Sequence, residues 1–446
     1  MSSRHLARSG LSAIAWIVIV ALVVVAAAGV YYYTRRPAAE APRQEQIGGT
    51  VTVLGVWGGG ELESFLAMVK PFEDATGVKV EFEGTRDLNA VLTTRLEGGN
   101  PPDAAVLPGP GQMAEFARAG RLVALDDVVD MTALKAQYAS SWIELGTVDG
   151  KLYGVFVKAA LKGLIWFNKP VLEQAGYRIP QTWNELMALT DRIAGEGRTP
   201  WCVGLESGAA SGWPATDWIE DIVLRSAGAA VYDRWYRHEI AWTDPAIRSA
   251  WEQFGRIAGN PRYVYGGRQG VLATNFGEAA NPLFTDPPGC YLHHQATFIQ
   301  DFIVKQYPDL TPGEDFDFFA FPKIDEQAPP SVEVAGDLVG MFKDTPQARA
   351  LLKYLTTPEA QAVWVKRGGA LSPNRKVSLD DYPDVLSRRA AEILTSAEVA
   401  RFDASDLMPE AVNSAFWKGT LDFIQNPSRL DAILQNIERI AQEAYK

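Results

Sequence analysis

The chain has 446 residues, of which 47% are hydrophobic and 22% are charged. This balance excludes a disordered chain and a membrane protein with many spans, and the length suits two or three packed domains. The net charge of −12, with only two cysteines and four histidines, argues against nucleic-acid binding and against a zinc site with several Cys or His ligands.

An uncharged segment near the N-terminus, residues 11–33, is the first recognisable element. At about 1.5 Å per residue it is long enough to cross a hydrocarbon core of about 30 Å, and arginines flank it on both sides. We therefore expect an N-terminal signal-anchor or transmembrane helix within residues 1–36. The alternative is a secretory signal that is cleaved near residues 26–28. Residues 37–48 predict a short polar tether.

Short apolar runs alternate with amphipathic stretches from residue 50 onward. The periodicity predicts strands over 51–56, 78–82 and 103–107 and helices over 61–75, 87–96 and 112–119. This order implies a parallel sheet with helices on both faces, and such sheets bind ligands at the carboxyl ends of their strands. We expect the loops at 57–60, 84–86 and 108–111 to line that crevice.

A second block of the same kind begins near residue 159. We expect strands over 163–167 and 201–205, a helix that Thr182 opens with a Thr-x-x-Glu capping box, and a helix from Pro214. Strands are expected over 316–321 and 331–342, and mostly helical sequence follows from residue 346 to 445. Together these patterns predict two α/β lobes.

The stretch 200–218 is the richest in residues suited to holding a ligand. Its small residues let backbone approach a ligand closely, Trp213 and Trp218 offer aromatic faces, and Glu206 and Asp217 offer hydrogen-bond acceptors. A sugar requires this combination, because its C–H face stacks on an aromatic ring while its hydroxyls donate to carboxylates. The alternative interpretation is that the tryptophans fill the core, where Trp is usually buried.

Four other polar residues stand at predicted strand ends or inside apolar runs: Arg86, Asp87, Lys158 and Asp337. Asp337 interrupts the apolar run 334–338, and a buried aspartate requires partners or a ligand. We regard all four as candidate ligand-binding residues, with surface ion pairs as the alternative.

Cys202 and Cys290 are the only cysteines, and in an exported protein we expect them to form one disulfide. Two buried free thiols are the first alternative, and a nucleophilic Cys–His pair is a weaker one. His293 and His294 are adjacent, so on a strand they point to opposite faces and do not suit a shared metal site.

The motifs of several enzyme classes are missing from the sequence. It has no GxxxxGK phosphate loop, no GxSxG nucleophile elbow and no HExxH zinc motif. The 54 acidic residues would allow a carboxylate pair for glycoside hydrolysis, but no spacing marks two of them. A glycoside-active enzyme therefore stays open as an alternative at this point.

Several segments together resemble the extracellular solute-binding proteins of bacterial ABC importers, in the carbohydrate-binding, maltose-binding-protein-like group. The resemblance covers about residues 49–446 and rests on FEDATGVKV (72–80), PDAA (102–105), LYGV (152–155), WFNK (166–169) and TWNEL (182–186). A closer similarity to α-glucoside-binding members rests on TRDLN (85–89), the stretch 200–218 and PPGCYLH (287–293).

The resemblance implies an α/β, two-lobed periplasmic-binding-protein fold of class II, in which each lobe is a mainly parallel sheet flanked by helices. It places residues 49–157 and 310–355 in the first lobe and residues 158–309 and 356–446 in the second. It also implies a monomeric sugar receptor that closes around an oligosaccharide and delivers it to the permease subunits of an ABC importer. No covalent chemistry, cofactor, metal or nucleic acid is implied.

For individual residues, the resemblance implies sugar contacts from both lobes and from the hinge. These residues are Trp57, Arg86, Gly336 and Asp337 in the first lobe, Trp213, Asp217 and Trp218 in the second, and Lys158 and Arg375 near the hinge and the returning C-terminal segment.

One feature departs from many relatives of this kind. The N-terminal segment has no cysteine for a lipid anchor but has the long uncharged stretch, so we expect a receptor on the outer face of the cytoplasmic membrane, anchored there or secreted after cleavage. Two other hypotheses stand beside this one. They are a binding-protein fold recruited as a sensor or scaffold, and an exported glycoside-active enzyme.

Overall fold

The computed structural model describes residues 46–325, 327–397 and 399–446. The predicted transmembrane segment and most of the predicted tether fall within residues 1–45 and so lie outside the described residues. Within the described ranges, no helix combines the length and the apolar character that crossing a membrane requires. The contacts from Ile47 to Lys446 form one unit.

The first sheet contains the three parallel strands that the sequence predicts. β1 (Thr50–Gly55) lies between β2 (Lys79–Gly84) and β3 (Ala104–Leu107) and is parallel to both. All four residues of β3 are buried, as expected for a strand that is covered on both faces. The carboxyl ends of the three strands therefore meet at one edge, where the sequence predicts ligand binding.

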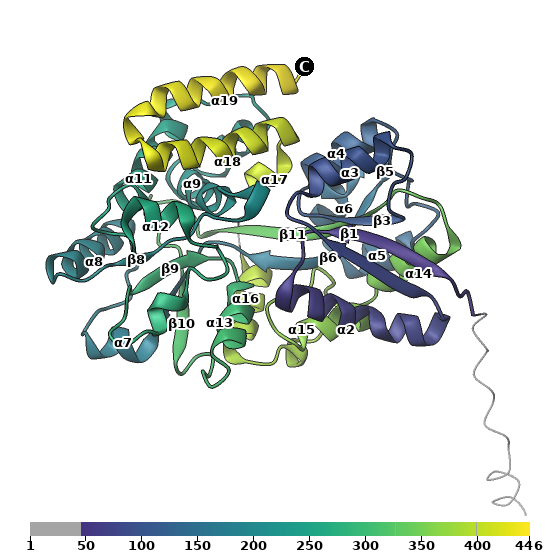
Figure 1. Cartoon of the computed structure of the whole chain (residues 1–446), viewed down its shortest axis with the longest axis horizontal. Helices are drawn as coiled ribbons and strands as arrows, with labels where there is room; N and C mark the ends of the chain where they lie inside the picture. Colours follow the sequence, from purple (N-terminus) through teal and green to yellow (C-terminus); the bar gives the residue numbers. More distant parts are fainter. Residues whose placement is uncertain (1–45, 326, 398) are drawn as a thin grey trace, which may run out of the picture. The chain divides into compact units, whose positions relative to one another are not determined.

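Three strands from later in the chain complete this sheet. β11 (Ser331–Met341) pairs with β12 (Val399–Phe402) at its start and antiparallel with β3 at its end, and on its opposite edge it pairs with β6 (Gly154–Leu161). β6 and β11 run side by side across the middle of Figure 1. In their register Lys158 lies opposite Asp337, and a bulge follows directly after Asp337.

Side chains along β6 point alternately to the two faces of the first sheet and join the apolar clusters there. Val155 and Val157 join a cluster that includes Trp57 and Trp364, whereas Phe156 joins a cluster on the other face. This division follows from the two-residue period of a strand. The second cluster continues to Trp166 and Cys202 of the other sheet, so packed side chains connect the two sheets without a break.

The second sheet has four strands in the order β10 (Phe316–Ala320), β7 (Leu164–Asn168), β9 (Leu292–Gln295) and β8 (Trp201–Cys202). β7 is antiparallel to both of its neighbours, and only β8 and β9 are parallel. The prediction of a mainly parallel sheet in each lobe is therefore wrong for this sheet. Apolar runs indicate that strands exist, but their directions depend on the long connections between them.

The helices fall into three runs along the chain. Before β6 come α2 (Gly59–Thr76), α3 (Leu88–Glu97), α4 (Pro110–Arg118), α5 (Met131–Gln137) and α6 (Ser140–Leu145). Between β7 and β10 come α7 (Lys169–Gln174), α8 (Trp183–Gly195), α9 (Trp213–Ser226), α10 (Ala229–Tyr236), α11 (Pro245–Ala258), α12 (Gly267–Ala273) and α13 (Ile299–Gln306). After β11 come α14 (Pro346–Leu355), α15 (Pro358–Val365), α16 (Val385–Ser396), α17 (Ala404–Leu407), α18 (Glu410–Gln425) and α19 (Leu430–Ala444).

Most of the predicted elements are confirmed, and α8 begins with the predicted capping box, in which Thr182 and Glu185 bond to each other's backbone. The strand predicted over 201–205 ends at Cys202, because Leu205 and Glu206 donate their backbone N–H groups to the 271–274 segment instead. The sequence did not predict β12, because a four-residue strand in helical surroundings has little local signal and depends on pairing with β11.

Cys202 and Cys290 form the predicted disulfide, with their Cα atoms 5.6 Å apart. Cys202 ends β8 and Cys290 precedes β9, so the bond joins two segments that are already neighbours in the second sheet. Both cysteines are buried, and the bond closes a separation of 88 residues. Loop-closure entropy in the unfolded chain is therefore the main stabilising effect to expect.

Replacing both cysteines with alanine should lower the free energy of unfolding by about 2–4 kcal/mol, because the unfolded chain regains the freedom of that loop. Denaturant unfolding of the two proteins measures the difference. A reducing agent should lower the midpoint of the wild type and leave that of the variant unchanged. Equal midpoints for wild type and variant would contradict the prediction.

Candidate functional site

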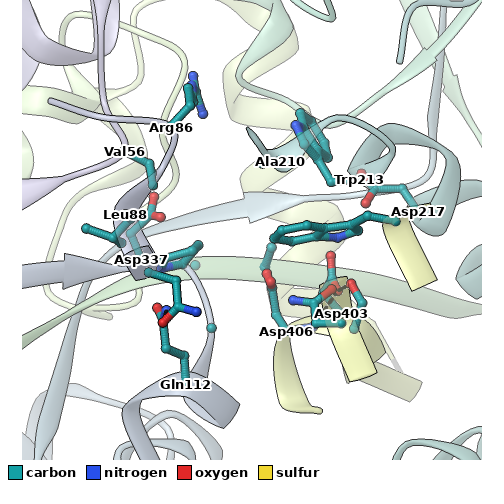
Figure 2. Close-up of a pocket in the computed structure, with 18 of the residues that line it drawn as sticks. Val56, Arg86, Leu88, Gln112, Ala210, Trp213, Asp217, Asp337, Asp403 and Asp406 are labelled. Atoms are coloured by element: carbon teal, nitrogen blue, oxygen red, sulfur yellow. Dashed lines mark hydrogen bonds between the residues drawn. The ribbon is translucent and has the colours of Figure 1, made fainter. Parts of the chain in front are cut away.

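A cavity of about 280 Å³ opens beside the carboxyl end of β1 and is lined by β6, β11, the start of α9 and the segment 403–417. This volume is close to the lower end of the range for small-molecule sites. Figure 2 shows Arg86 and Asp337 on one side of the space, with Trp213 and Asp217 on the other. The cavity thus lies at the strand ends where the sequence predicts binding.

Eight of the predicted sugar-binding residues line this cavity: Trp57, Arg86, Asp87, Lys158, Trp213, Asp217, Gly336 and Asp337. They come from five separate parts of the chain, and the pairing of β6 with β11 brings two of these parts together, Lys158 and Gly336–Asp337. We call Trp57, Glu61, Arg86, Lys158 and Asp337 the first wall. We call Trp213, Asp217, Asp403, Asn413 and Trp417 the second wall.

Three predicted residues do not reach the cavity. Trp218 lies in the core, where its ring centre is 4.3 Å from that of His294, because it projects from a different face of α9 than Trp213 and Asp217. Glu206 accepts hydrogen bonds from the Gly208 N–H and from Asn275 Nδ2, both at 2.7 Å, and so shapes the adjacent turn. Arg375 is exposed and donates to the backbone carbonyl of Tyr138.

Lys158 is the centre of the first wall. Its ammonium group is buried, forms a hydrogen-bonded ion pair with Glu61 and lies 3.6 Å from Oδ2 of Asp337. Burial alone would lower the pKa of Lys158, but the carboxylates of Glu61 and Asp337 raise it overall, so the lysine stays charged. The Glu61 carboxylate also lies 4.0 Å from Arg86.

Trp57 contributes its N–H rather than an open aromatic face. Its side chain is only 1% exposed and packs edge-on against Trp364, with the ring centres 4.7 Å apart. The indole Nε1 donates to Oδ2 of Asp337 at 3.1 Å. Trp57 and Lys158 therefore both contact the Asp337 carboxylate and orient it within the first wall.

Two residues of the second wall come from the first turns of α9. Trp213 and Asp217 are four residues apart and so share one helical face, which is the face that lines the cavity. The Lys162 ammonium lies 2.8 Å from Oδ2 of Asp217, 2.8 Å from Oδ2 of Asp403 and 5.2 Å from the centre of the Trp213 ring. One buried cation therefore holds two acids and the aromatic ring in place.

The second wall is backed by more buried acids than cations. Burial, and then the charges of Asp221 and Glu220, raise the pKa of Glu333 well above its usual range. Burial also raises the pKa of Asp217 to about 7, with Lys162 opposing the shift. Asp403 differs, because Lys162 overcomes the effect of burial and lowers its pKa. Several of these acids therefore hold protons near neutral pH.

Oxygen atoms of Asp217, Glu333 and Asp403 lie within 4.8 Å of one another, which is close enough to share a metal ion. The Lys162 ammonium already lies against two of these three carboxylates. A divalent cation would have to displace that ammonium, so the arrangement fits an ion-paired lysine better than a metal.

Residues 403–417 form a part of the site that the sequence did not predict. Asp403, Ser405 and Asp406 come from the start of α17, and Asn413 and Trp417 come from one face of α18. The only local signal is the four-residue spacing of Asn413 and Trp417, which many helices share. Their role depends on α18 packing against α9, which is a contact between distant segments.

The chain is similar to known proteins over most of its length. Residues 58–362 match the family described as bacterial extracellular solute-binding protein. The chain is 43% identical to the osmoprotective compounds-binding protein GgtB of Synechocystis sp., over 87% of this chain and 91% of that protein. It is 40% identical to the alpha-glucosides-binding periplasmic protein AglE of Rhizobium meliloti, over 86% of this chain and 85% of that protein.

Solved structures with the same fold are more distant in sequence. The bacterial solute receptor AcbH, with its exclusive preference for β-D-galactopyranose, superimposes with a TM-score of 0.77 at 20% identity, over 90% of this chain and all of that one. A chitin oligosaccharide binding protein has a TM-score of 0.77 at 19% identity, over 89% of this chain and 99% of that one. At this level of identity the likeness concerns the fold alone.

The excess of buried acids makes a prediction about stability. Above the usual pKa of a glutamate the unfolded chain releases the proton of Glu333, whereas the folded protein keeps it, so stability falls as the pH rises. Glu333→Gln removes this loss. Between about pH 5 and about pH 8 the wild type should lose roughly 1–3 kcal/mol more unfolding free energy than the variant.

Denaturant unfolding at the two pH values measures this difference. Glu278→Gln makes the same chemical change at an exposed position and should follow the wild type. Parallel pH profiles for Glu333→Gln and the wild type would show that Glu333 is ionised in the folded protein.

Proposed function

The chain belongs to the bacterial extracellular solute-binding proteins, and from this premise we propose that its cavity binds the glucosyl ring of an α-glucoside. The general role of the family is to capture a solute outside the cytoplasm and deliver it to the permease of an ABC transporter. The proposal of an α-glucoside is supported by the 40% identity to a relative that binds alpha-glucosides. It is also supported by the chemistry of the second wall.

One observation carries the proposal. Trp213 presents a half-buried ring to the cavity, and Asp217, one helical turn later, is 2% exposed. The Oδ2 atom of Asp217 lies 2.8 Å from the Lys162 ammonium, whereas its Oδ1 atom has no hydrogen-bond partner within the described chain. An unpaired buried acceptor costs about 1–3 kcal/mol, which a ligand hydroxyl would relieve by donating to it. An aromatic face beside a carboxyl group with one unused oxygen therefore suits a sugar ring.

The first wall would complete the binding of the ring. Arg86 is partly exposed, and its guanidinium lies 4.9 Å from the ring centre of Phe276. It can therefore donate to ligand oxygens while it packs on the Phe276 ring. Asp337 is held by Trp57 and Lys158 and can accept from a further hydroxyl. Both walls would contact one ligand only when they approach it together, which favours the closed form of a hinged receptor.

The lobes that would close are proposed to follow the two sheets. The predicted division is 49–157 with 310–355 against 158–309 with 356–446. Three short segments depart from this division, because residues 316–320 pair in the second sheet and residues 158–161 and 399–402 pair in the first. We further propose a monomeric receptor that the segment 11–33 holds at the outer face of the cytoplasmic membrane, and its absence of charge supports this role.

The 43% identity to a protein that binds osmoprotective compounds favours a second ligand class. As this second class we consider quaternary ammonium compounds. The second wall has acidic groups and an aromatic ring, which also suit a quaternary ammonium group. Lys162 opposes this alternative, because its own ammonium already lies beneath the Trp213 ring.

The full chain in detergent should bind at least one of maltose, trehalose, sucrose and palatinose with a Kd of about 1 μM or lower, and without hydrolysing it. Isothermal titration calorimetry measures binding, and chromatography of the recovered sugar tests for hydrolysis. Glucose is included as the single ring and glycine betaine as the quaternary ammonium. Binding of glycine betaine alone, or of no compound, would contradict the α-glucoside proposal.

Trp213→Ala should weaken binding of the preferred sugar by about tenfold or more, because the ring face that packs on the sugar is lost. Tyr265→Ala serves as the control, since this aromatic is 48% exposed and does not line the cavity. Both variants should melt in one cooperative transition. Unchanged affinity in Trp213→Ala would remove this residue from the binding site.

A further inference from the structure

The unused hydrogen-bonding capacity of the cavity is concentrated on the second wall. Asn413 Oδ1 and Trp417 Nε1 are buried and have no hydrogen-bond partner among the described residues, as is also true of Asp217 Oδ1. On the first wall, by contrast, Trp57 donates to Asp337 and Lys158 donates to Glu61. A ligand therefore gains more from new hydrogen bonds on the second wall than on the first.

Asn413 and Trp417 extend this capacity beyond Trp213 and Asp217. They lie one turn apart on α18, and both line the cavity. Asn413 offers an acceptor and Trp417 offers a donor. A hydroxyl group both donates and accepts, so this pair suits hydroxyl-bearing chemistry, whereas an alkyl group would leave both atoms unsatisfied.

Tight backbone packing fixes the position of α18 relative to α9. Gly212, which immediately precedes Trp213, has φ +110°, and a Cβ atom there would lie 2.3 Å from the carbonyl oxygen of Trp417. Thr420 Oγ1 donates to the Trp417 carbonyl at 2.7 Å and lies 3.3 Å from the Gly212 carbonyl. Trp417 and Trp213 are therefore carried on backbone segments in direct contact.

We propose that α18 forms a second ligand subsite, in which Asn413 and Trp417 hydrogen-bond a hydroxyl-bearing unit linked to the ring held by Trp213 and Asp217. This inference rests on the proposed function and specifies its substrate class. The ligand has two units, and the second is a sugar ring or polyol rather than an alkyl group. Asn413 and Trp417 then determine specificity between glycosides that share the same first ring.

The first test compares two ligands on the full-length wild type. Methyl α-glucoside has the first ring with an alkyl group in place of the second unit. Calorimetry should show that it binds about tenfold or more weakly than the preferred disaccharide, the difference expected from about one or two lost hydrogen bonds. Equal affinities would overturn the inference, because the second unit would then contribute nothing.

The second test removes one polar group at a time. Asn413→Ala and Trp417→Phe, of which the latter keeps an aromatic ring, should each weaken disaccharide binding about fivefold or more. Asn436→Ala makes the matched change at an exposed position on α19 and should bind like the wild type. Thermal melting identifies any variant that does not fold, and the other variant then decides the question.

The outcomes separate this inference from the proposed function. If no sugar binds the wild type, the α-glucoside proposal fails and the subsite fails with it. If a disaccharide binds and the folded α18 variants keep the wild-type affinity, the subsite alone is overturned.

Discussion

The pairing of β6 with β11 determines how the cavity is built, because it buries two lysines on the segment that passes from one sheet to the other. Lys158 and Lys162 are four residues apart, so an extended backbone turns both side chains to the same face. A buried ammonium is stable only beside carboxylates. Lys158 obtains them from α2 and β11, and Lys162 obtains them from α9 and the start of α17. Through these ion pairs the one segment 158–162 contacts acids of both walls.

The two walls differ in how completely their own polar groups are satisfied. On the first wall the hydrogen bonds of Trp57, Lys158 and Asp337 hold a fixed arrangement before any ligand arrives. On the second wall Asp217 and Asn413 retain buried oxygens without partners in the described structure. Unsatisfied groups reduce stability, and proteins tolerate them where a ligand uses them. The second wall is therefore where recognition of the ligand is concentrated.

Neighbouring residues on α9 show why part of the site could be predicted and part could not. The sequence presents Trp213, Asp217 and Trp218 as equally suitable, since all three have chemistry that suits a sugar. Helical geometry separates them: Trp213 and Asp217 line the cavity, while Trp218 packs against Trp201 in the core. Trp57 shows the same limit, because its aromatic neighbours bury its face and leave only its N–H in use.

The sequence by itself determined the parallel strands at the start of the fold, the capping box of α8, the disulfide and the resemblance to solute-binding proteins. The strands, the capping box and the resemblance depend on short-range periodicity or on motifs of a few adjacent residues, whereas the disulfide was predicted because the chain has only two cysteines. Only the tertiary structure decided the directions of the strands in the second sheet, the partners of Lys162 and the place of α18 in the cavity. These features depend on contacts between residues up to 241 positions apart, as between Lys162 and Asp403, which no local pattern encodes.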